Sequence, residues 1–501
     1  YHKGEKTVFT VNQRMGGGTW VYLGTFDFDR GCNEFNRVVC TNQASSRGIV
    51  TTDAVRFGGG MGSIARGGQT SGLPRCLEGA RYYAQWAGAP YKVYGGRAGK
   101  NDYADDINTR SLMTNWLGGG SVYMPAVQGK RVPIELSLAL HSDAGYNHDG
   151  KTTWGALSIC TTDFNDGMLS SGVSRIASKD FAKALRDNLV TDLTAQFGGV
   201  GKRYVWDKNY SETRLPEVPS AILEMLSHQN FPDMRIAQDP MGKFWIARSI
   251  YKTILRYVSS NHGCRYVVQP LAPDNFSATL DQVGNAHLSW SPQLDKTESS
   301  ARPTGYIVYK AEGKGGFDNG TVVNSTTCLV TLEPNKLYHF RVAAINPGGE
   351  SFPSETLSVL YRPKATKTVL VVNNFHRLAS PQVVDNGQEQ GFDLDKDPGV
   401  SYGLYTGWSG KQHSFDRRRM GDETTQGMGY SGNEMVGKFI DGNEFCYVAE
   451  HASSIASAAK YSIASCSSQA IASGKVRMQG YQAVGLINGL ERYDGYTHQF
   501  Y

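Results

Sequence analysis

The sequence predicts a multidomain protein in which mixed α/β units alternate with all-β units. A chain of 501 residues is long enough for three or four domains of ordinary size. Hydrophobic residues make up 40% of it and charged residues 19%, a balance typical of globular chains. Short glycine-rich runs in which apolar and polar residues alternate are followed by segments in which strands and helices alternate. The same two patterns then occur again in that order. We expect a partial β-sandwich over residues 1–60, a mixed α/β sheet domain over 61–262, a β-sandwich over 268–362 and a second α/β domain over 366–501.

The elements of the first two regions follow from their periodicity. The N-terminal region holds four alternating segments, KTVFTVNQ, GGGTWVYLGTFDF, RVVCTNQ and GIVTTDAVRF, which make about half a sandwich. The next region contains apolar, strand-like runs separated by amphipathic helical segments. Its strands are expected at residues 132–140, 155–160 and 219–226, and its helices near 77–86, 104–116, 178–196 and 242–258.

Composition excludes several classes of protein. A formal net charge of +5, without a basic run interleaved with aromatic residues, argues against a nucleic-acid partner. No apolar run reaches the ~18–20 residues that a membrane span needs. The eight cysteines form no CxxC pair and so predict neither a zinc knuckle nor a dense disulfide framework. Because strand-like sequence starts at Tyr1 and no closing element ends the chain, we expect a piece of a longer protein.

Two residues of the second region are candidates for a catalytic or metal-binding role. His141 follows the buried strand VPIELSLAL, and α/β folds place their active sites at such strand ends. Glu224 interrupts the apolar strand PSAILEML, where an ionised carboxylate costs several kcal/mol unless a metal or a partner compensates it. The alternatives are a structural histidine and a Glu224 paired with an arginine such as Arg214.

These motifs resemble those of the zinc-dependent N-acetylmuramoyl-L-alanine amidases of type 3. The segment LALHSDA at residues 138–144 is similar to the family's histidine motif, and VPSAILE at 218–224 is similar to its glutamate motif. Four further residues fit the same order along the chain. They are Arg110 and Asn115 in an R-x4-N helix before the histidine strand, and Asn230 and Asp233 before the last helix.

The resemblance implies a metallohydrolase in which His141 binds zinc and Glu224 is the catalytic carboxylate. Zinc lowers the pKa of its bound water to ~7 and polarises the scissile carbonyl. Glu224 would take the proton of this water and hand it to the leaving amine. The implied substrate is the amide bond between the lactyl group of muramic acid and L-alanine in peptidoglycan.

The sequence departs from that family in its first metal-binding motifs. The family's site is His, Glu, His, and no His-Gly motif occurs between Tyr1 and His141. We expect the two remaining ligands to lie upstream of Tyr1. The other option for the glutamate ligand is Glu78, in the segment CLEGAR.

The other regions resemble accessory modules. Residues 1–60 resemble the C-terminal half of a golvesin/xanthan-lyase-type carbohydrate-binding-like domain inserted in the amidase. There Trp20 is either a sugar-stacking platform or a core residue. Residues 268–362 resemble a fibronectin type III domain, with Trp290 as its core tryptophan and Tyr338 in a tyrosine corner.

Residues 366–501 resemble the C-terminal domain of proteins described as xanthan lyases, a flavodoxin-like or glutamine-amidotransferase-like α/β unit that stops before its last helix. Cys466 and His451 suggest a Cys/His pair. However, the G-x-C-x-G elbow of true amidotransferases is absent, so packing is the alternative for Cys466.

These observations predict a secreted or periplasmic bacterial amidase that uses zinc and acts on peptidoglycan. One alternative is a polysaccharide-binding or polysaccharide-degrading surface protein in which the amidase fold only binds. A lyase needs a Tyr/His or Arg/Asn set beside a uronate, and the sequence offers no such set. A non-catalytic adhesive surface protein is the third hypothesis.

Overall fold

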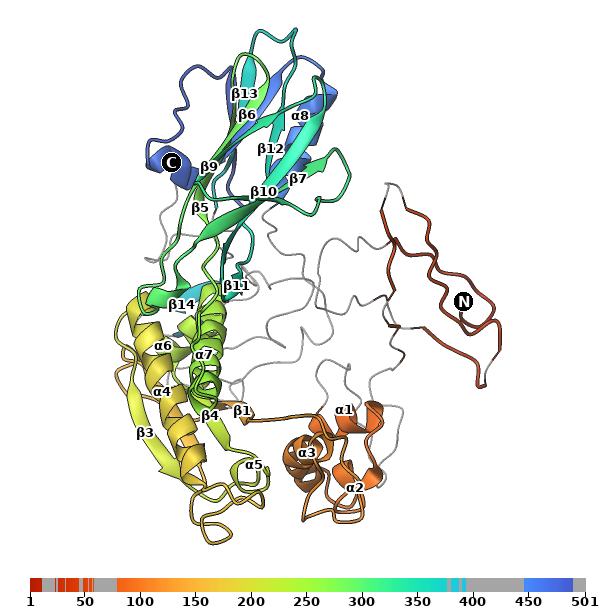
Figure 1. Cartoon of the computed structure of the whole chain (residues 1–501), viewed down its shortest axis with the longest axis vertical. Helices are drawn as coiled ribbons and strands as arrows, with labels where there is room; N and C mark the ends of the chain where they lie inside the picture. The colour runs from red at the N-terminus through yellow and green to blue at the C-terminus, as the bar shows by residue number, and fades with distance from the viewer. Residues whose placement is uncertain are drawn as a thin grey trace.

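The structure, a computed structural model, describes residues 1–10, stretches between 23 and 57, and residues 79–375, 380–386, 390–392 and 446–489. Figure 1 shows a lower part that contains helices α1 to α7 and an upper part built mainly of strands. Glu78 and Trp20 lie outside the described residues. No helix of the described ranges combines the length and apolar character that crossing a membrane requires.

Among the described residues, three helices precede the first sheet. They are α1 (Ala80–Trp86), α2 (Tyr91–Tyr94) and α3 (Asp102–Leu117). Helix α3 begins where the side chain of Asn101 accepts a 2.9 Å hydrogen bond from the Ala104 amide, and the helix is followed by Gly118. Leu112 and Trp116 of this helix pack with Val93 of α2 in a small apolar core. The segments α1 and α3 agree with the helices expected near 77–86 and 104–116.

Over the ranges that the structure describes, the first sheet has four strands in the order β1-β4-β2-β3. Strand β4 runs parallel to β1 and antiparallel to β2, while β3 runs parallel to β2. This is the mixed sheet that the sequence predicts. The strands are β1 (Ser137–Asp143), β2 (Ala156–Cys160), β3 (Lys202–Asp207) and β4 (Ser220–Ser227).

Helices α4 (Ile176–Phe197) and α7 (Pro240–Asn261) cover one face of this sheet, as Figure 1 shows. Leu185 and Leu189 of α4 pack against Leu223 of β4. Strand alternation directs Ile222 and Glu224 of β4 to the opposite face. Two short helices, α5 (Ser211–Arg214) and α6 (Phe231–Ala237), flank β4 in the sequence.

A β-sandwich follows α7. Its core contains Trp290, which is 1% exposed, and Tyr338, whose hydroxyl bonds the backbone of Glu333 as in a tyrosine corner. Both residues therefore lie where the sequence predicts them. The strands are β5 (Asp274–Leu280), β6 (Asn285–Ser291), β7 (Gly305–Glu312), β8 (Thr321–Val323), β9 (Thr327–Thr331), β10 (Leu337–Asn346), β11 (Gly349–Glu350) and β12 (Leu357–Leu360).

The described part of the C-terminal region holds three parallel strands in the order β16-β13-β17. Strand β13 occupies one edge of β16, and β12 and β5 of the sandwich pair with its other edge. Among the described residues, both regions therefore form one 11-stranded sheet. The expected boundary at 362–366 therefore crosses a continuous sheet. The elements are β13 (Thr368–Asn373), β14 (Val383–Asp385), β15 (Gln390–Phe392), α8 (Tyr447–Ser457), β16 (Ser462–Ser467), α9 (Ser468–Ala472) and β17 (Ala483–Ile487).

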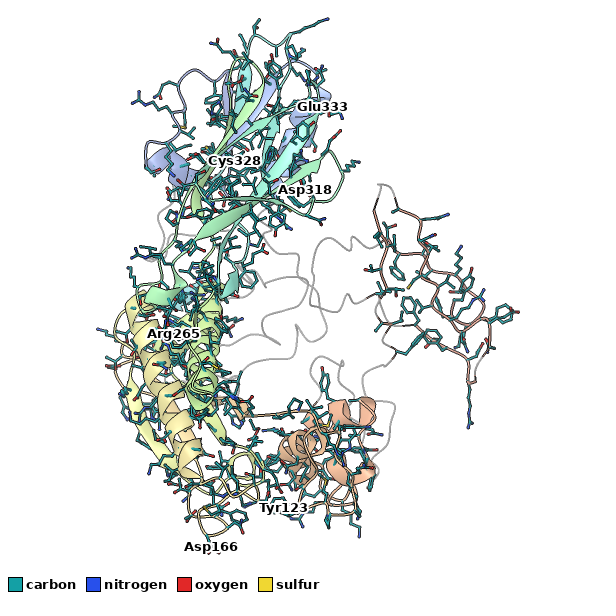
Figure 2. All side chains as sticks on the ribbon, viewed as in Figure 1. Tyr123, Asp166, Arg265, Asp318, Cys328 and Glu333 are labelled. Carbon is teal, nitrogen blue, oxygen red and sulfur yellow. The ribbon has the colours of Figure 1, made fainter. Side chains whose placement is uncertain are left out.

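Charged residues connect α7 to the loop between β6 and β7. The ammonium of Lys252, which is 0% exposed, lies 2.7 Å from Asp192 and 3.4 Å from Asp295. Arg248 binds Asp295 at 2.8 Å. These buried contacts attach the first α/β unit to the sandwich. Figure 2 shows Arg265 near this junction, with Asp318, Cys328 and Glu333 distributed over the upper part.

Candidate functional site

His141 and Glu224 lie opposite each other on the two parallel strands β1 and β4. They are register partners, and the His141 Nδ1 atom lies 3.7 Å from Glu224 Oε1. Both side chains extend from the sheet face opposite α4 and α7, because Leu223 beside Glu224 packs on those helices. Residues 83 positions apart in the sequence are thus brought together at one site.

A third residue, Glu212 on α5, completes this cluster and was not predicted from the sequence. Its Oε2 atom lies 3.0 Å from His141 Nε2, and its Oε1 atom accepts a 3.1 Å hydrogen bond from Arg110 on α3. Arg110 also binds Asp106 at 3.0 Å. The histidine ring therefore has a carboxylate near each nitrogen, and one of these carboxylates is held by an arginine.

The neighbours of these groups shift their pKa values in opposite directions. The hydrogen bond to Glu212 raises the pKa of His141 above its usual range, against the opposing effect of burial. Burial would raise the pKa of Glu212, but the contacts with His141 and Arg110 outweigh it and lower that pKa. Burial, with the nearby Glu212 charge, raises the pKa of Glu224 although His141 opposes this.

Glu224 does not form the ion pair with Arg214 that was one alternative. The Arg214 guanidinium instead donates a 2.7 Å hydrogen bond to Asn209 and lies 5.7 Å from the centre of the Phe164 ring. Glu224 Oε2 is buried and has no hydrogen-bond partner within the described ranges. A buried carboxylate oxygen without a partner is costly, so its retention is consistent with a chemical role.

The R-x4-N pair of α3 positions the segment that leads into β4. The Asn115 amide donates a 2.9 Å hydrogen bond to the Leu215 carbonyl, and its Oδ1 atom accepts one of 3.0 Å from the Glu217 amide. Five residues earlier on the same helix, Arg110 binds Glu212. Both residues of the motif thus hold residues 212–217 against α3.

Asn230 and Asp233 hold the loop that follows β1. The Asn230 amide donates to the Thr152 carbonyl at 3.0 Å. Asp233 accepts hydrogen bonds from the amides of Trp154, Gly155 and Ser227. Burial nevertheless raises the pKa of Asp233 to about 6. These two residues shape the site without contacting the His141–Glu224 pair.

The described residues do not by themselves fit a zinc ion. No three His, Cys, Asp or Glu side chains within the described ranges gather as metal ligands. A four-coordinate site normally needs at least three protein ligands. His141 would therefore need ligands beyond the described residues, and Glu78 belongs to the part of the chain that is not described.

The structure gives no support to a catalytic role for Cys466. Its thiol is fully buried in β16, and burial raises its pKa to about 12, so the reactive thiolate is scarce near neutral pH. His451 is exposed on α8. Packing explains Cys466 best.

Two family matches cover parts of the chain. Residues 1–59 match the Golvesin C-terminal domain, and residues 271–360 match the fibronectin type III domain. Both agree with the resemblances found in the sequence at 1–60 and 268–362. No amidase family appears among these matches, so the amidase assignment remains a prediction.

The solved structures that match are similar over about the length of one domain. A chain titled "Myokine structure" is 22% identical, with 19% of this chain and 99% of that chain covered and a TM-score of 0.16. The FN5 domain of Drosophila Lar is 28% identical, with 19% and 97% covered and a TM-score of 0.15. Titin domains A168–A170 are 24% identical, with 19% and 32% covered and a TM-score of 0.17.

Proposed function

We propose that this protein hydrolyses the N-acetylmuramoyl-L-alanine amide bond of peptidoglycan outside the cytoplasm. The observation that carries the proposal is the pairing of His141 with Glu224 across β1 and β4. Two motifs that are 83 positions apart in the sequence thereby converge on one face of the sheet. The Golvesin C-terminal and fibronectin type III matches are consistent with an extracellular protein.

Glu224 is the residue that moves the proton. Amide hydrolysis requires a base that takes a proton from the attacking water and an acid that gives one to the leaving α-amine of L-alanine. A half-buried carboxylate with a raised pKa can do both in turn. Glu212 and Arg110 hold the His141 ring beside this carboxylate. A zinc ion could complete such a site only with ligands beyond the described residues.

The test is release of peptide stems from purified peptidoglycan by the full-length protein, with zinc added and with a chelator. Mass spectrometry should detect a new free carboxyl on the lactyl group and a new N-terminal L-alanine. Glu224→Gln should lower the rate by about 10²–10⁴-fold, the usual contribution of a general acid–base residue. Glu135→Gln changes an exposed glutamate that also pairs with a histidine, and it should leave the rate unchanged. Absence of release, or equal release by both variants, would contradict the proposal.

The alternative function is glycan binding or polysaccharide breakdown without amide hydrolysis. Exposed aromatic side chains on strand β3 favour the binding form of this alternative. In that case the protein retains sacculi or polysaccharide in a pull-down but releases no peptide from peptidoglycan.

A further inference from the structure

Three aromatic side chains lie exposed along strand β3 and the turn after it. Tyr204, Trp206 and Tyr210, here called the aromatic strip, are 53%, 36% and 42% exposed. Strand β3 is the edge of its sheet, and Tyr204 and Trp206 are exposed on it while Val205 between them packs against the core. Large aromatic side chains grouped on a surface commonly mark a binding site.

The three rings form a continuous but twisted platform. The centre of the Trp206 ring lies 6.2 Å from that of Tyr204 and 6.1 Å from that of Tyr210. The ring planes meet at 86° and 65°, so neighbouring rings stand edge to face. A flat crystalline surface needs coplanar rings. Rings whose planes differ in orientation from one residue to the next fit a single flexible polysaccharide chain.

One cation beside the strip is available to a ligand. The Lys208 ammonium lies 5.5 Å from the centre of the Trp206 ring and makes no ion pair within the described ranges. The neighbouring cations are already engaged, since Arg203 binds Asp143 and Lys202 binds Asp187 at 2.9 Å. Lys208 can therefore attract a carboxylate on a ligand that lies on the strip.

The strip and the His141–Glu224 pair share one face of the sheet. Trp206 is the register partner of Ile159, which is the partner of Ile222, two residues before Glu224 on the same side of β4. Strand β3 is two strand spacings from β4, or about 10 Å. At its other end the strip reaches Tyr210, which directly precedes α5 and its Glu212.

We propose that the aromatic strip binds a single polysaccharide strand that carries carboxylate groups. The apolar C–H faces of pyranose rings stack on the electron-rich faces of Tyr and Trp, while the hydroxyl of tyrosine and the indole N–H remain free to bond sugar hydroxyls. Lys208 favours an anionic glycan over a neutral one. That the bound glycan continues from the strip toward Glu212 and His141 rests on the proposed function. Binding of the glycan at the strip itself does not.

The test is affinity electrophoresis of the full-length protein in gels that contain carboxymethylcellulose, neutral hydroxyethylcellulose or soluble uncross-linked peptidoglycan strands. Trp206→Ala should weaken binding of both anionic polymers by about tenfold, as expected when a central aromatic anchor is lost. Lys208→Gln should reduce the preference for the anionic over the neutral cellulose. Tyr103→Ala removes a 77% exposed tyrosine on α3 and should leave retardation unchanged.

A second variant distinguishes loss of the aromatic side chain from misfolding of the protein. Trp206→Phe keeps an aromatic face at the edge of β3, and it should retain most of the binding with an unchanged unfolding midpoint. Equal retardation of Trp206→Ala and Tyr103→Ala would overturn the proposal. Tighter binding of a single-stranded DNA probe than of the anionic polysaccharides would also overturn it. The same variants show whether the DNA binds at the strip.

The proposal and the amidase function can fail separately. Glu224→Gln should lower the rate of peptide release by about 10²–10⁴-fold but leave retardation on the peptidoglycan strands unchanged. Trp206→Ala should weaken retardation even if no peptide is ever released. Absence of peptide release by the unmodified protein, with binding retained, therefore counts against the amidase. Unchanged binding by Trp206→Ala, with release retained, counts against the strip.

Discussion

Glu212 joins two parts of the site, because its carboxylate contacts His141 Nε2 at 3.0 Å and Arg110 Nη1 at 3.1 Å. We predict that Glu212→Ala lowers the rate of amide hydrolysis by about 10–100-fold, the usual effect of losing a residue that orients a site histidine. The ¹⁵N shifts of the His141 ring, measured by NMR, should change at the same time, because Nε2 loses its acceptor.

Glu135→Ala is the matched control for this prediction. Glu135 binds His262 at 2.8 Å, but both side chains are about half exposed. Its removal should change the His262 signals and leave both the rate and the His141 signals unaltered. A Glu212→Ala protein with wild-type rate and wild-type His141 shifts would show that the contact is incidental.

The buried ammonium of Lys252 should be essential for stability. Lys252→Met leaves Asp192 and Asp295 without their shared cation, and breaking a buried pair in this way costs about 3–5 kcal/mol. Urea unfolding followed by circular dichroism measures the change. Adding Asp192→Asn to Lys252→Met should recover part of the loss, because Asp295 keeps its contact with Arg248 and the double variant removes the carboxylate that pairs with Lys252 alone among the described residues.

Lys336 provides the comparison for Lys252. It pairs with Glu312 at 3.0 Å and with Glu333 at 2.9 Å, but on the surface. Exposed pairs contribute little to stability, so Lys336→Met should leave the unfolding midpoint unchanged. Similar losses for Lys252→Met and Lys336→Met would refute the importance of the buried network.

Glu355 should make stability fall as the pH rises. Its Oε1 atom is buried without a hydrogen-bond partner among the described residues, and burial raises its pKa from 4.5 to about 7. Because the folded pKa lies above the unfolded one, the folded state binds more protons between these values. The free energy of unfolding therefore decreases from about pH 4.5 to about pH 7.

Glu355→Gln should remove this pH dependence. The variant should match the wild type near pH 5 and exceed it by up to a few kcal/mol at pH 8, as urea titrations at the two pH values would measure. Glu333→Gln changes a carboxylate that is 68% exposed and should show no such difference. Identical pH profiles for the wild type and Glu355→Gln would contradict the raised pKa.

The cysteines should separate into two reactivity classes. Cys160 and Cys466 are fully buried, and burial raises the pKa of each to about 12. Cys40 and Cys264 are exposed. Iodoacetamide applied to the native protein at neutral pH should modify Cys40 and Cys264 and spare the buried pair, as peptide mass spectrometry would show. Rapid modification of Cys466 would reopen the hypothesis of a catalytic thiol.

Elements with strong local periodicity could be predicted from the sequence. The helix expected at 178–196 is α4, Ile176–Phe197, because its apolar spacing continues over the whole element. The strand expected at 132–140 is instead β1, Ser137–Asp143. Its hydrogen-bonding partner β4 sets those limits, pairing Ser137 with Ser220 and Asp143 with Ser227. Such limits depend on tertiary pairing and not on local pattern.

The candidate site was predictable only in part. His141 directly follows an apolar strand-like run and Glu224 interrupts another, so both could be identified as candidates from the sequence. Glu212 lies in a four-residue helix without periodicity, and its partner His141 is 71 positions away. The aromatic strip was missed for a similar reason, since KRYVWD offers only Val205 to the core and lacks a clear apolar face.

The position of β16 has a consequence for the order of folding. Ser465 exchanges hydrogen bonds with Ser358, 107 residues earlier, and β16 also pairs with β5. During synthesis, the backbone N–H and C=O groups of β5 and β12 that pair with β16 therefore have no partner until more than a hundred residues after β12 have been made. Open edges invite pairing with other chains. A sandwich that ends at residue 361 lacks β16, so the edges of β5 and β12 stay unpaired. It should therefore aggregate more readily than the longer chain.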